Sequence, residues 1–292
     1  MLKMDYSEIQ PIIDLHTCIQ GEGMKVGVPH ILIRTSGCNL RCTFKGSICD
    51  TAYSSWNPEK GKYSLNDVVD IIIMNPQIKC MLITGGEPTL HPELLRSLIE
   101  IGRRHKLSVS METNGTIARG DVLDEDTYVD VVSISPKLKS SIPSSGEFAE
   151  KHAKTRENIP AIVSWIMESK FSQLKYVVSS EDDIKEVERQ VRKIKKEVSK
   201  LDPFWPVIVY LMPEGDTEEK LAEKRKYQSD LQKASMRRSA SCRFSSEQVY
   251  AIRMKPSPHS PKALPGMQTT FCSSSRRLQN STLLRPKLLM SA

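Results

Sequence analysis

The sequence predicts an α/β fold built on a parallel β-sheet, and three observations support this prediction. Short apolar runs alternate with segments of helical periodicity over the first 215 or so residues. Repeated strand-then-helix units favour parallel strands joined by right-handed crossovers. Polar and glycine-rich motifs directly follow the apolar runs, which places them at the carboxyl ends of the strands, where such sheets carry their sites. The chain of 292 residues is long enough for one large domain or two small ones.

Four elements are expected in the first hundred or so residues: a strand at 30–35, a helix at 64–73, a strand at 80–84 and a helix at 91–102. Ser64 is a favourable N-cap residue for the first helix. Gly85 and Gly86 end the second strand. Pro92 lies in the first turn of the second helix, where its missing N–H is not needed.

The elements expected after these are strands at 107–112, 129–135, 174–178 and 206–212, and helices at about 145–169 and at 181–200. The helix at 181–200 is strongly charged, with many Glu and Lys residues at helical spacing. Asp216 is expected to cap a final helix. Trp165 and its apolar neighbours are expected in the core.

Charge divides the chain into two parts. Residues 227–292 hold 11 Lys and Arg and 2 Asp and Glu, so the first 226 residues hold the remaining 31 and 33 and are close to neutral. We therefore expect a core domain at 1–226 and a basic, disordered C-terminal tail at 227–292. The tail is open to three interpretations: an extension without function, a nucleic-acid-binding arm, or the product of a shifted reading frame.

The cysteines favour a reducing compartment. Three of the seven lie in one loop and four are scattered, which does not resemble the disulfide framework of a secreted protein. The polar N-terminus does not resemble a secretory signal peptide, and no apolar run is long enough to span a bilayer. We expect a cytoplasmic protein without a membrane segment. Cys18 and Cys80 are expected to be small core residues, and His16 and His30 structural ones.

Cys38, Cys42 and Cys49 form the pattern Cys-x3-Cys-x6-Cys in one short stretch. Three thiolates on a loop suit a [4Fe–4S] cluster that keeps one iron free for a further ligand. A zinc site completed by a distant His or Cys, or three unrelated thiols, would also fit these three residues. The cysteines alone leave these alternatives open.

Several further motifs lie near strand ends: Ile19-Gln20-Gly21-Glu22-Gly23, Arg34-Thr35-Ser36-Gly37-Cys38, Cys49-Asp50-Thr51, Thr84-Gly85-Gly86-Glu87-Pro88, Glu112-Thr113-Asn114-Gly115, Ser135-Pro136-Lys137 and Met212-Pro213-Glu214-Gly215. The two adjacent glycines let a ligand approach the backbone, and Glu87 can accept hydrogen bonds from an ammonium group. Over about residues 8–225, the set resembles the 7-carboxy-7-deazaguanine synthases, a family of the radical S-adenosylmethionine (SAM) superfamily.

The resemblance implies a partial (β/α) barrel of the radical SAM type and a lyase activity. The reaction would convert 6-carboxy-5,6,7,8-tetrahydropterin to 7-carboxy-7-deazaguanine with release of ammonia, in queuosine and related 7-deazapurine biosynthesis. The implied cofactors are a [4Fe–4S] cluster, SAM and Mg²⁺. The implied partners are the carboxypterin substrate, a flavodoxin- or ferredoxin-type electron donor and a second copy of the chain in a homodimer. Neither a membrane nor a nucleic acid is among them.

The resemblance also assigns roles to single residues. Cys38, Cys42 and Cys49 would bind the cluster, Thr51 would bind Mg²⁺, and Glu112 would bridge substrate and cofactor. SAM would contact Ile48, Cys49, Asp50, Gly86, Ser135, Pro136, Lys137 and Ser179. The substrate would contact Ile19, Gln20, Gly21, Arg34, Thr84 and Pro213. An arginine suits a carboxylate because its guanidinium can bind both oxygens.

Alternatives remain for some of these roles. Arg34 could form a structural ion pair, and Thr51 could cap a turn. The family commonly has Cys-x2-Cys where this chain has Cys42-x6-Cys49, and nothing after about Lys226 matches the family's compact C-terminal segment. Two other functions are kept open: a radical SAM enzyme acting on another protein or heterocycle, and a metal-bearing module that binds nucleic acid.

Overall fold

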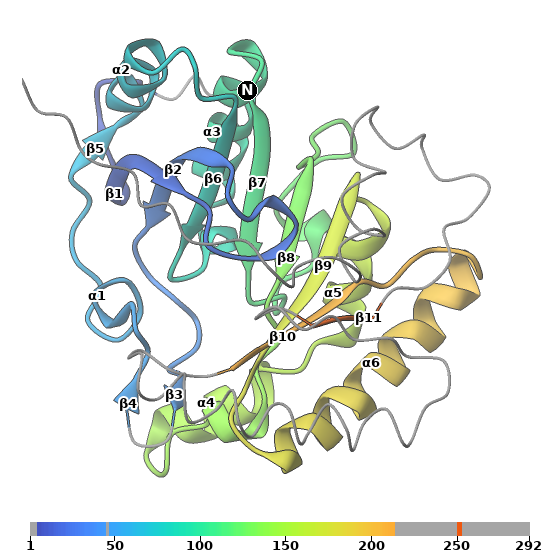
Figure 1. Cartoon of the computed structure of the whole chain (residues 1–292). Coiled ribbons are helices and arrows are strands. Elements are labelled where there is room, and N and C mark those ends of the chain that lie inside the picture. The colour runs from blue at the N-terminus through green and yellow to red at the C-terminus, as the bar shows by residue number, and fades with distance from the viewer. Residues whose placement is uncertain (1–4, 45–46, 214–249, 253–292) are drawn as a thin grey trace, which may run out of the picture.

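The computed structural model describes residues 5–44, 47–213 and 250–252, and one mixed sheet organises them (Figure 1). Within these residues the sheet has nine strands. In spatial order they are β11 (Tyr250–Ile252), β10 (Val209–Pro213), β9 (Phe171–Val178), β8 (Val131–Ile134), β7 (Ser108–Thr113), β6 (Cys80–Gly85), β2 (Pro29–Thr35), β1 (Ile9–Ile19) and β5 (Tyr63–Ser64). The strands from β10 to β2 are mutually parallel, which confirms the predicted parallel sheet.

The helices are α1 (Ala52–Ser55), α2 (Leu65–Met74), α3 (Pro92–Arg104), α4 (Glu147–Thr155), α5 (Ile159–Met167) and α6 (Glu181–Leu201), with short 3₁₀ turns η1 (Gly23–Lys25), η2 (Pro88–Leu90), η3 (Arg119–Asp121) and η4 (Lys139–Ser141). Ser64 caps α2 as expected: its hydroxyl accepts a hydrogen bond from the Asp67 N–H, and the Asp67 carboxylate accepts one from the Ser64 N–H. The proline at the start of α3 also lies where the sequence predicts it.

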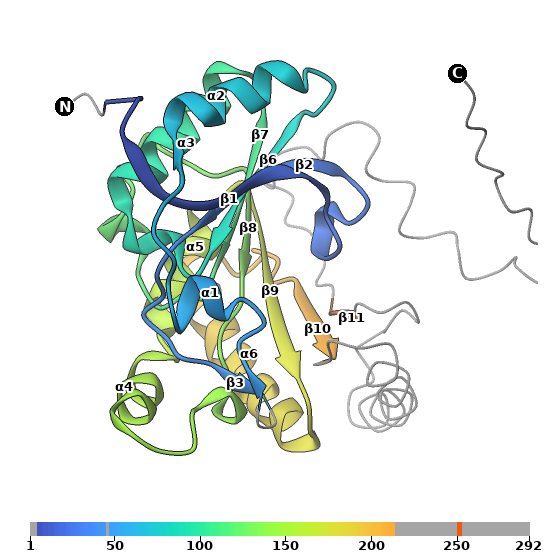
Figure 2. The same cartoon turned by 90° about the vertical axis from the view of Figure 1, so that its left-hand side faces the viewer.

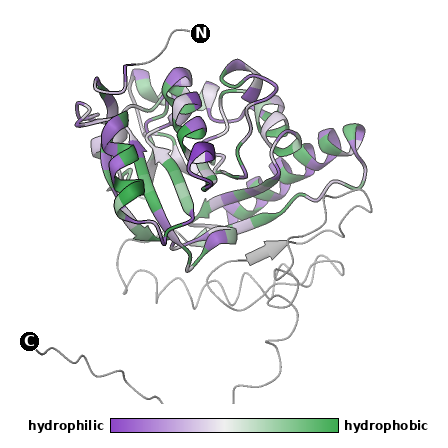
Figure 3. Cartoon of the chain, turned by 90° about the horizontal axis from the view of Figure 1, so that it is seen from above, coloured by the Kyte–Doolittle hydropathy of each residue, from purple (hydrophilic) through white to green (hydrophobic). Residues whose placement is uncertain are grey.

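Helices cover one face of the parallel strands and bury the core against them. Helix α3 packs on β6 and β7, and α5 packs on β8, β9 and α6. Leu98, Ile99 and Ile162 are fully buried there, and Trp165 is buried as predicted, with its indole N–H donating to the carbonyl of Ile117. Figure 3 shows the resulting pattern, with hydrophobic strands and amphipathic helices. Figure 2 shows the twist of the sheet, since β1 and β2 run across the view and β9 runs down it.

One prediction needs correction, and one long strand was missed. The helix expected at about 145–169 is two helices, because Asn158 starts a new one: its side chain accepts from the Ala161 N–H, and Pro160 occupies the first turn of α5. Strand β1 was not predicted. It pairs antiparallel with β2 and with β5, and its register against β5 shifts around Pro11.

The C-terminal part of the sequence is described only at Tyr250–Ile252, which pair antiparallel with β10. The helix expected after Asp216 and the rest of the expected tail lie outside the described residues. Across the described parts of the chain, no helix is both long enough and apolar enough to cross a membrane.

Candidate active site

A cavity of about 640 Å³ opens at the carboxyl ends of the parallel strands, where the sequence predicts the site. Five of those strands line it, through Leu32 and Arg34 on β2, Leu82, Thr84 and Gly85 on β6, Glu112 and Thr113 on β7, Lys175 and Val177 on β9, and Met212 on β10. The loop after β8 adds Ser135 and Lys137. The three-cysteine loop closes the cavity on another side.

All three cysteines of the motif line this cavity. Cys38 follows β2, and the chain then reaches Cys42 and forms a small hairpin of β3 (Thr43–Phe44) and β4 (Ser47–Ile48). The hairpin accounts for the six residues between Cys42 and Cys49. It returns the chain to its starting point, and the Cys49 N–H donates to the Cys42 carbonyl over 3.1 Å. The longer spacing therefore still places Cys49 beside Cys42.

Two properties of the cysteine thiols bear on the kind of metal site that they could form. Nowhere in the described ranges do three or more His, Cys, Asp or Glu side chains form a group that could hold one metal ion. A [4Fe–4S] cluster would not require three side chains that converge on one ion, because each cysteine would bind a different iron. Burial raises the pKa of Cys38 to about 11 and that of Cys42 to about 12. Both thiols are therefore protonated at neutral pH, and a metal that binds them would have to displace their protons.

The turn after β6 packs tightly against the cysteine loop. The Glu87 N–H donates to the Gly37 carbonyl over 2.8 Å, and the Gly86 N–H donates to the Thr35 carbonyl over 3.1 Å. A Cβ added at Gly86 would lie 2.1 Å from the Gly37 oxygen. Gly86 is thus required by the close approach of two loops, and it also lines the cavity.

Glu87 is used inside the fold. Its carboxylate is fully buried and accepts hydrogen bonds from the Thr89 N–H and hydroxyl, the Thr113 hydroxyl and the Asn114 N–H. Burial raises its pKa, and these hydrogen bonds act in the opposite direction. Glu87 does not line the cavity, so its position does not support the ammonium-binding role that we expected.

Asn114 is a residue of the site that sequence reasoning missed. Its side-chain oxygen accepts from the Thr116 N–H and hydroxyl, which fixes the amide orientation. Its Nδ2 then donates to Asn39 Oδ1 over 2.9 Å and lies 4.0 Å from Cys38 Sγ. Asn114 belongs to the Glu112-Thr113-Asn114-Gly115 motif at the end of a predicted strand, but a role was expected there only for Glu112. Asn114 joins the end of β7 to the cysteine loop.

Glu112 lies at the centre of a polar group on the cavity wall. It accepts from the Thr84 hydroxyl over 3.0 Å and from Gln20 Nε2 over 3.3 Å. Arg34 lines the same cavity and donates from Nε to Asp14 over 2.8 Å. The structural ion pair considered for Arg34 is therefore present, yet it uses Nε only, and the described residues form no hydrogen bond with either Nη atom.

Glu22 and Lys175 form an ion pair on the cavity wall that the sequence did not predict. Burial lowers the pKa of Lys175, but the negative charges of Glu112 and Glu22 outweigh it, and the net shift is upward. Lys175 therefore carries a positive charge beside the carboxylate of Glu112. The sequence of β9 does not predict this ion pair, because the partners of Lys175 lie far from it in the sequence.

The remaining predicted residues divide into two groups. Gly21, Ile48, Asp50 and Thr51 line the cavity with those named above. Thr51 makes no side-chain cap for α1, and its hydroxyl lies 3.4 Å from Cys49 Sγ. Ile19 is exposed, Pro136 is buried outside the cavity lining, and Pro213 is the last residue of β10. The Ser179 hydroxyl donates to Asp183 at the start of α6 and does not reach the lining.

The histidines and scattered cysteines considered in the sequence stay apart from the lining. His30 is fully buried, with Nδ1 bonded to the Val28 carbonyl, and burial lowers its pKa. His16 is exposed. Cys80 is buried as expected, whereas Cys18 is partly exposed.

Comparisons with known proteins identify the family of the chain. Residues 32–144 match the model of the radical SAM superfamily. The chain is 35% identical over 225 residues to the 7-carboxy-7-deazaguanine synthase of Halobacterium salinarum, covering 74% of this chain and 81% of that protein. It is 35% identical over 205 residues to the enzyme of Rhodopirellula baltica, covering 69% and 72%. The crystal structure of QueE from Escherichia coli gives a TM-score of 0.48 at 21% identity, covering 75% of this chain and 90% of that one. By its sequence identity to these curated relatives, the chain belongs to the 7-carboxy-7-deazaguanine synthase family.

Proposed function

We propose that this protein is a radical SAM lyase that converts 6-carboxy-5,6,7,8-tetrahydropterin to 7-carboxy-7-deazaguanine with release of ammonia. The observation that carries the proposal is one cavity lined by Cys38, Cys42 and Cys49 at one side and by the Gln20–Glu112–Thr84 group and Arg34 at another. Membership of the family supports the [4Fe–4S] cluster and SAM.

The cluster and SAM, when bound, would supply the one-electron chemistry needed to abstract hydrogen from the pterin. The residues of the chain would bind and orient the cluster, SAM and the substrate. Cys38, Cys42 and Cys49 would hold the cluster. Ser135 and Lys137, with Gly86, Ile48 and Asp50, would hold SAM; the Lys137 ammonium already donates to the Ser135 hydroxyl over 3.0 Å.

The substrate would lie against the opposite wall. Arg34 is suited to the carboxylate, because Asp14 holds Nε and fixes the plane of the guanidinium. Gln20, Gly21, Thr84 and Glu112 would bind polar edges of the pterin. Glu112, which already accepts from Thr84 and Gln20, would accept hydrogen bonds from ring N–H groups, and the positively charged Lys175 lines the same cavity.

Three finer points are also part of the proposal. Thr51 lines the cavity beside Cys49 and would supply an oxygen ligand to Mg²⁺, a hard ion that would also bind the substrate carboxylate. Family membership alone supports a flavodoxin- or ferredoxin-type electron donor and a homodimer. A cytoplasmic location agrees with the need to keep the cluster thiols reduced.

The test is anaerobic reconstitution of the full-length chain with iron and sulfide, followed by reduction in the presence of SAM. We expect a brown protein that forms 7-carboxy-7-deazaguanine from the carboxypterin, detected by chromatography and mass spectrometry. Omission of Mg²⁺ should lower the rate. Arg34→Lys, which keeps the charge but loses the planar fork, should raise KM for the carboxypterin by about tenfold.

Two outcomes would contradict the proposal. SAM cleavage without product from the carboxypterin would point to another radical SAM reaction. A colourless zinc protein that binds DNA even at 150 mM salt and favours one sequence would point to a nucleic-acid module.

A further inference from the structure

Three successive residues in the loop after β8 each have a backbone group that is hydrogen-bonded to a side chain, and none of these side chains lines the cavity. We name residues 135–141 the post-β8 loop. The Lys137 carbonyl accepts from Arg156 Nη1 over 2.9 Å, the Leu138 carbonyl accepts from the Ser141 hydroxyl over 2.6 Å, and the Lys139 N–H donates to Glu186 Oε2 over 2.8 Å. The backbone of this loop is therefore fixed on the side away from the site.

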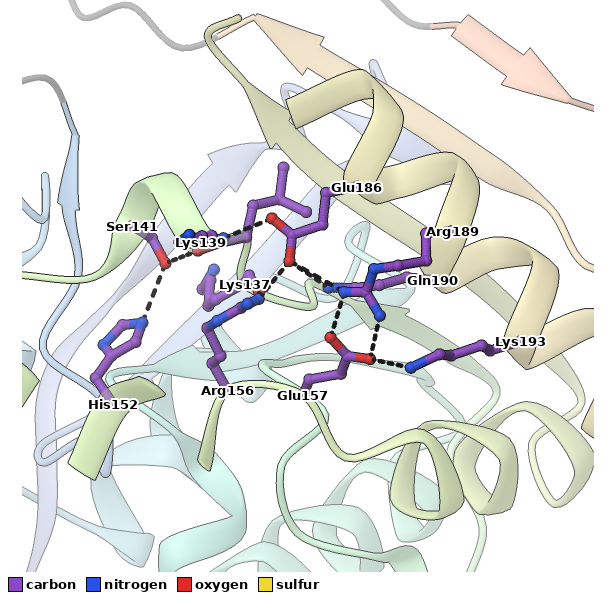
Figure 4. Close-up of polar contacts among 11 residues, drawn as sticks. Lys137, Lys139, Ser141, His152, Arg156, Glu157, Glu186, Arg189, Gln190 and Lys193 are labelled. Carbon is purple, nitrogen blue, oxygen red and sulfur yellow. Dashed lines mark hydrogen bonds and ion pairs between the residues drawn. The ribbon is translucent and has the colours of Figure 1, made fainter. Parts of the chain in front are cut away.

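Glu186 on α6 joins two of these contacts. Its Oε1 accepts from Arg156 Nη1 over 2.7 Å, and its Oε2 accepts from the Lys139 N–H (Figure 4). The side chains of Glu186 and Arg156 are only 13% and 11% exposed, so water screens their ion pair little. Neither residue lines the cavity. Any influence on the site must pass through the loop.

The same loop is tied to the cysteine loop by His152. Its Nε2 lies 3.0 Å from the Ser141 hydroxyl, and its Nδ1 accepts from the Arg41 N–H over 3.2 Å. Arg41 lies between Cys38 and Cys42 in the sequence. The post-β8 loop is thus fixed between α6 and the cysteine loop, with Ser135 and Lys137 exposed to the cavity.

We infer that Glu186, together with Arg156, is a positioning residue for SAM: it holds the post-β8 loop in the conformation that presents Ser135 and Lys137 to the cofactor. This inference rests on the proposed role of those two residues in SAM binding. A carboxylate that accepts several donors in a partly buried place fixes them more firmly than a neutral group can, because charged hydrogen bonds are the stronger ones.

The neighbouring Glu157 provides a matched control. It accepts from Arg189 over 2.8 and 2.5 Å and from Lys193 over 3.1 Å, and it shares Arg189 with Glu186 (Figure 4). Within the described residues it has no hydrogen bond to the post-β8 loop. Glu157→Gln therefore removes a comparable ion pair from the same network without releasing the loop.

The experiment compares wild type, Glu186→Gln and Glu157→Gln as full-length proteins. Hydrogen exchange of peptides covering 137–141 is measured in cluster-free protein. The dissociation constant for SAM is measured by equilibrium dialysis in reconstituted, unreduced protein. We expect Glu186→Gln to speed exchange in this segment and to weaken SAM binding about tenfold, with KM for the carboxypterin unchanged. Glu157→Gln should match wild type in both measurements.

Unchanged SAM affinity in Glu186→Gln, or equal weakening in Glu157→Gln, would overturn the inference. If Glu186→Gln does not fold, as judged by circular dichroism, Arg156→Met takes its place, because it frees the Lys137 carbonyl and leaves the Lys139 contact intact. The same expectations apply to it. Should SAM binding depend on Glu186 while wild type makes no 7-carboxy-7-deazaguanine, the proposed function fails and the positioning role stands.

Discussion

At the scale of single residues, His152 shows how a buried imidazole can make the fold sensitive to acid. It is almost fully buried, and its Nδ1 accepts a hydrogen bond from the cysteine loop. Burial lowers the pKa of His152 to about 4, and the charges of Arg156 and Lys137 act in the same direction. The folded protein therefore requires the neutral ring, whereas the unfolded chain protonates it near pH 6.5.

The sign of the pH dependence follows from this difference. The contribution of His152 to stability is fully present above about pH 6.5 and is lost as pH falls from there toward about 4. We predict that His152→Gln lowers the free energy of unfolding at pH 7.5 and flattens its decline between pH 6.5 and 4. Urea unfolding of cluster-free protein at stepped pH measures this, with the exposed His16→Gln as control. Equal slopes in wild type and His152→Gln would contradict it.

Some site residues could be predicted from sequence and others could not, for a physical reason. Cys38, Cys42 and Cys49 carry their chemistry in their type and lie close together along the chain. Asn114, and the pair of Glu22 with Lys175, matter only through partners that the fold brings to them from distant parts of the chain. A single residue type does not reveal such a partner. Glu87 shows the converse, since its residue type suggested a ligand and its burial gives it an internal role.

At the scale of elements, the contact between the turn after β6 and the cysteine loop leaves no room for a side chain. We predict that Gly86→Ala destabilises the cluster-free protein by about 1–3 kcal/mol through overpacking and reduces the iron retained after reconstitution. Both effects follow from the close approach of the Gly37 and Ser54 carbonyl oxygens to a Cβ at this position. Denaturant unfolding and iron analysis measure them.

Gly120→Ala is the control for this substitution, because a Cβ at Gly120 meets nothing within 4 Å. It should leave stability and iron content close to those of wild type. A Gly86→Ala protein with the stability and iron content of wild type would show that the two loops are free to move apart.

Elements with a continuous apolar pattern were predicted correctly, because a parallel strand covered on its faces is apolar throughout. Strand β1 was not predicted because it is polar toward its end and contains Pro11. It is stabilised as a strand by pairing with β2. The division between α4 and α5 was also missed. The Asn158 side chain caps α5, and this capping residue together with Pro160 marks a helix start inside the range that was expected to be one helix.

At the scale of the whole molecule, the sequence separates a nearly neutral body from a strongly basic segment. We predict that the full-length chain binds double-stranded DNA weakly at about 20 mM salt and releases it by about 150 mM, because nonspecific binding is driven by counterion release. A chain ending at Lys226 should not bind at either salt concentration. Fluorescence anisotropy with two unrelated DNA sequences of equal length measures this.

Equal affinity for the two DNA sequences is expected, since the predicted attraction depends on charge alone. Binding that persists at 150 mM salt and favours one sequence would instead give residues 227–292 a recognition role. Retained binding by the chain ending at Lys226 would place the attraction on the body and contradict its near-neutral charge.

Because of the hairpin of β3 and β4, the position of Cys49 does not depend on the length of the cysteine loop. An antiparallel excursion begins and ends at the same place, so residues can be added to it or removed from it in pairs while Cys49 stays bonded to the Cys42 carbonyl. In this chain, the number of residues between Cys42 and Cys49 is therefore a poor measure of how close the two cysteines lie. A search pattern written with a fixed interval between the second and third cysteines would pass over chains, such as this one, in which a hairpin separates them.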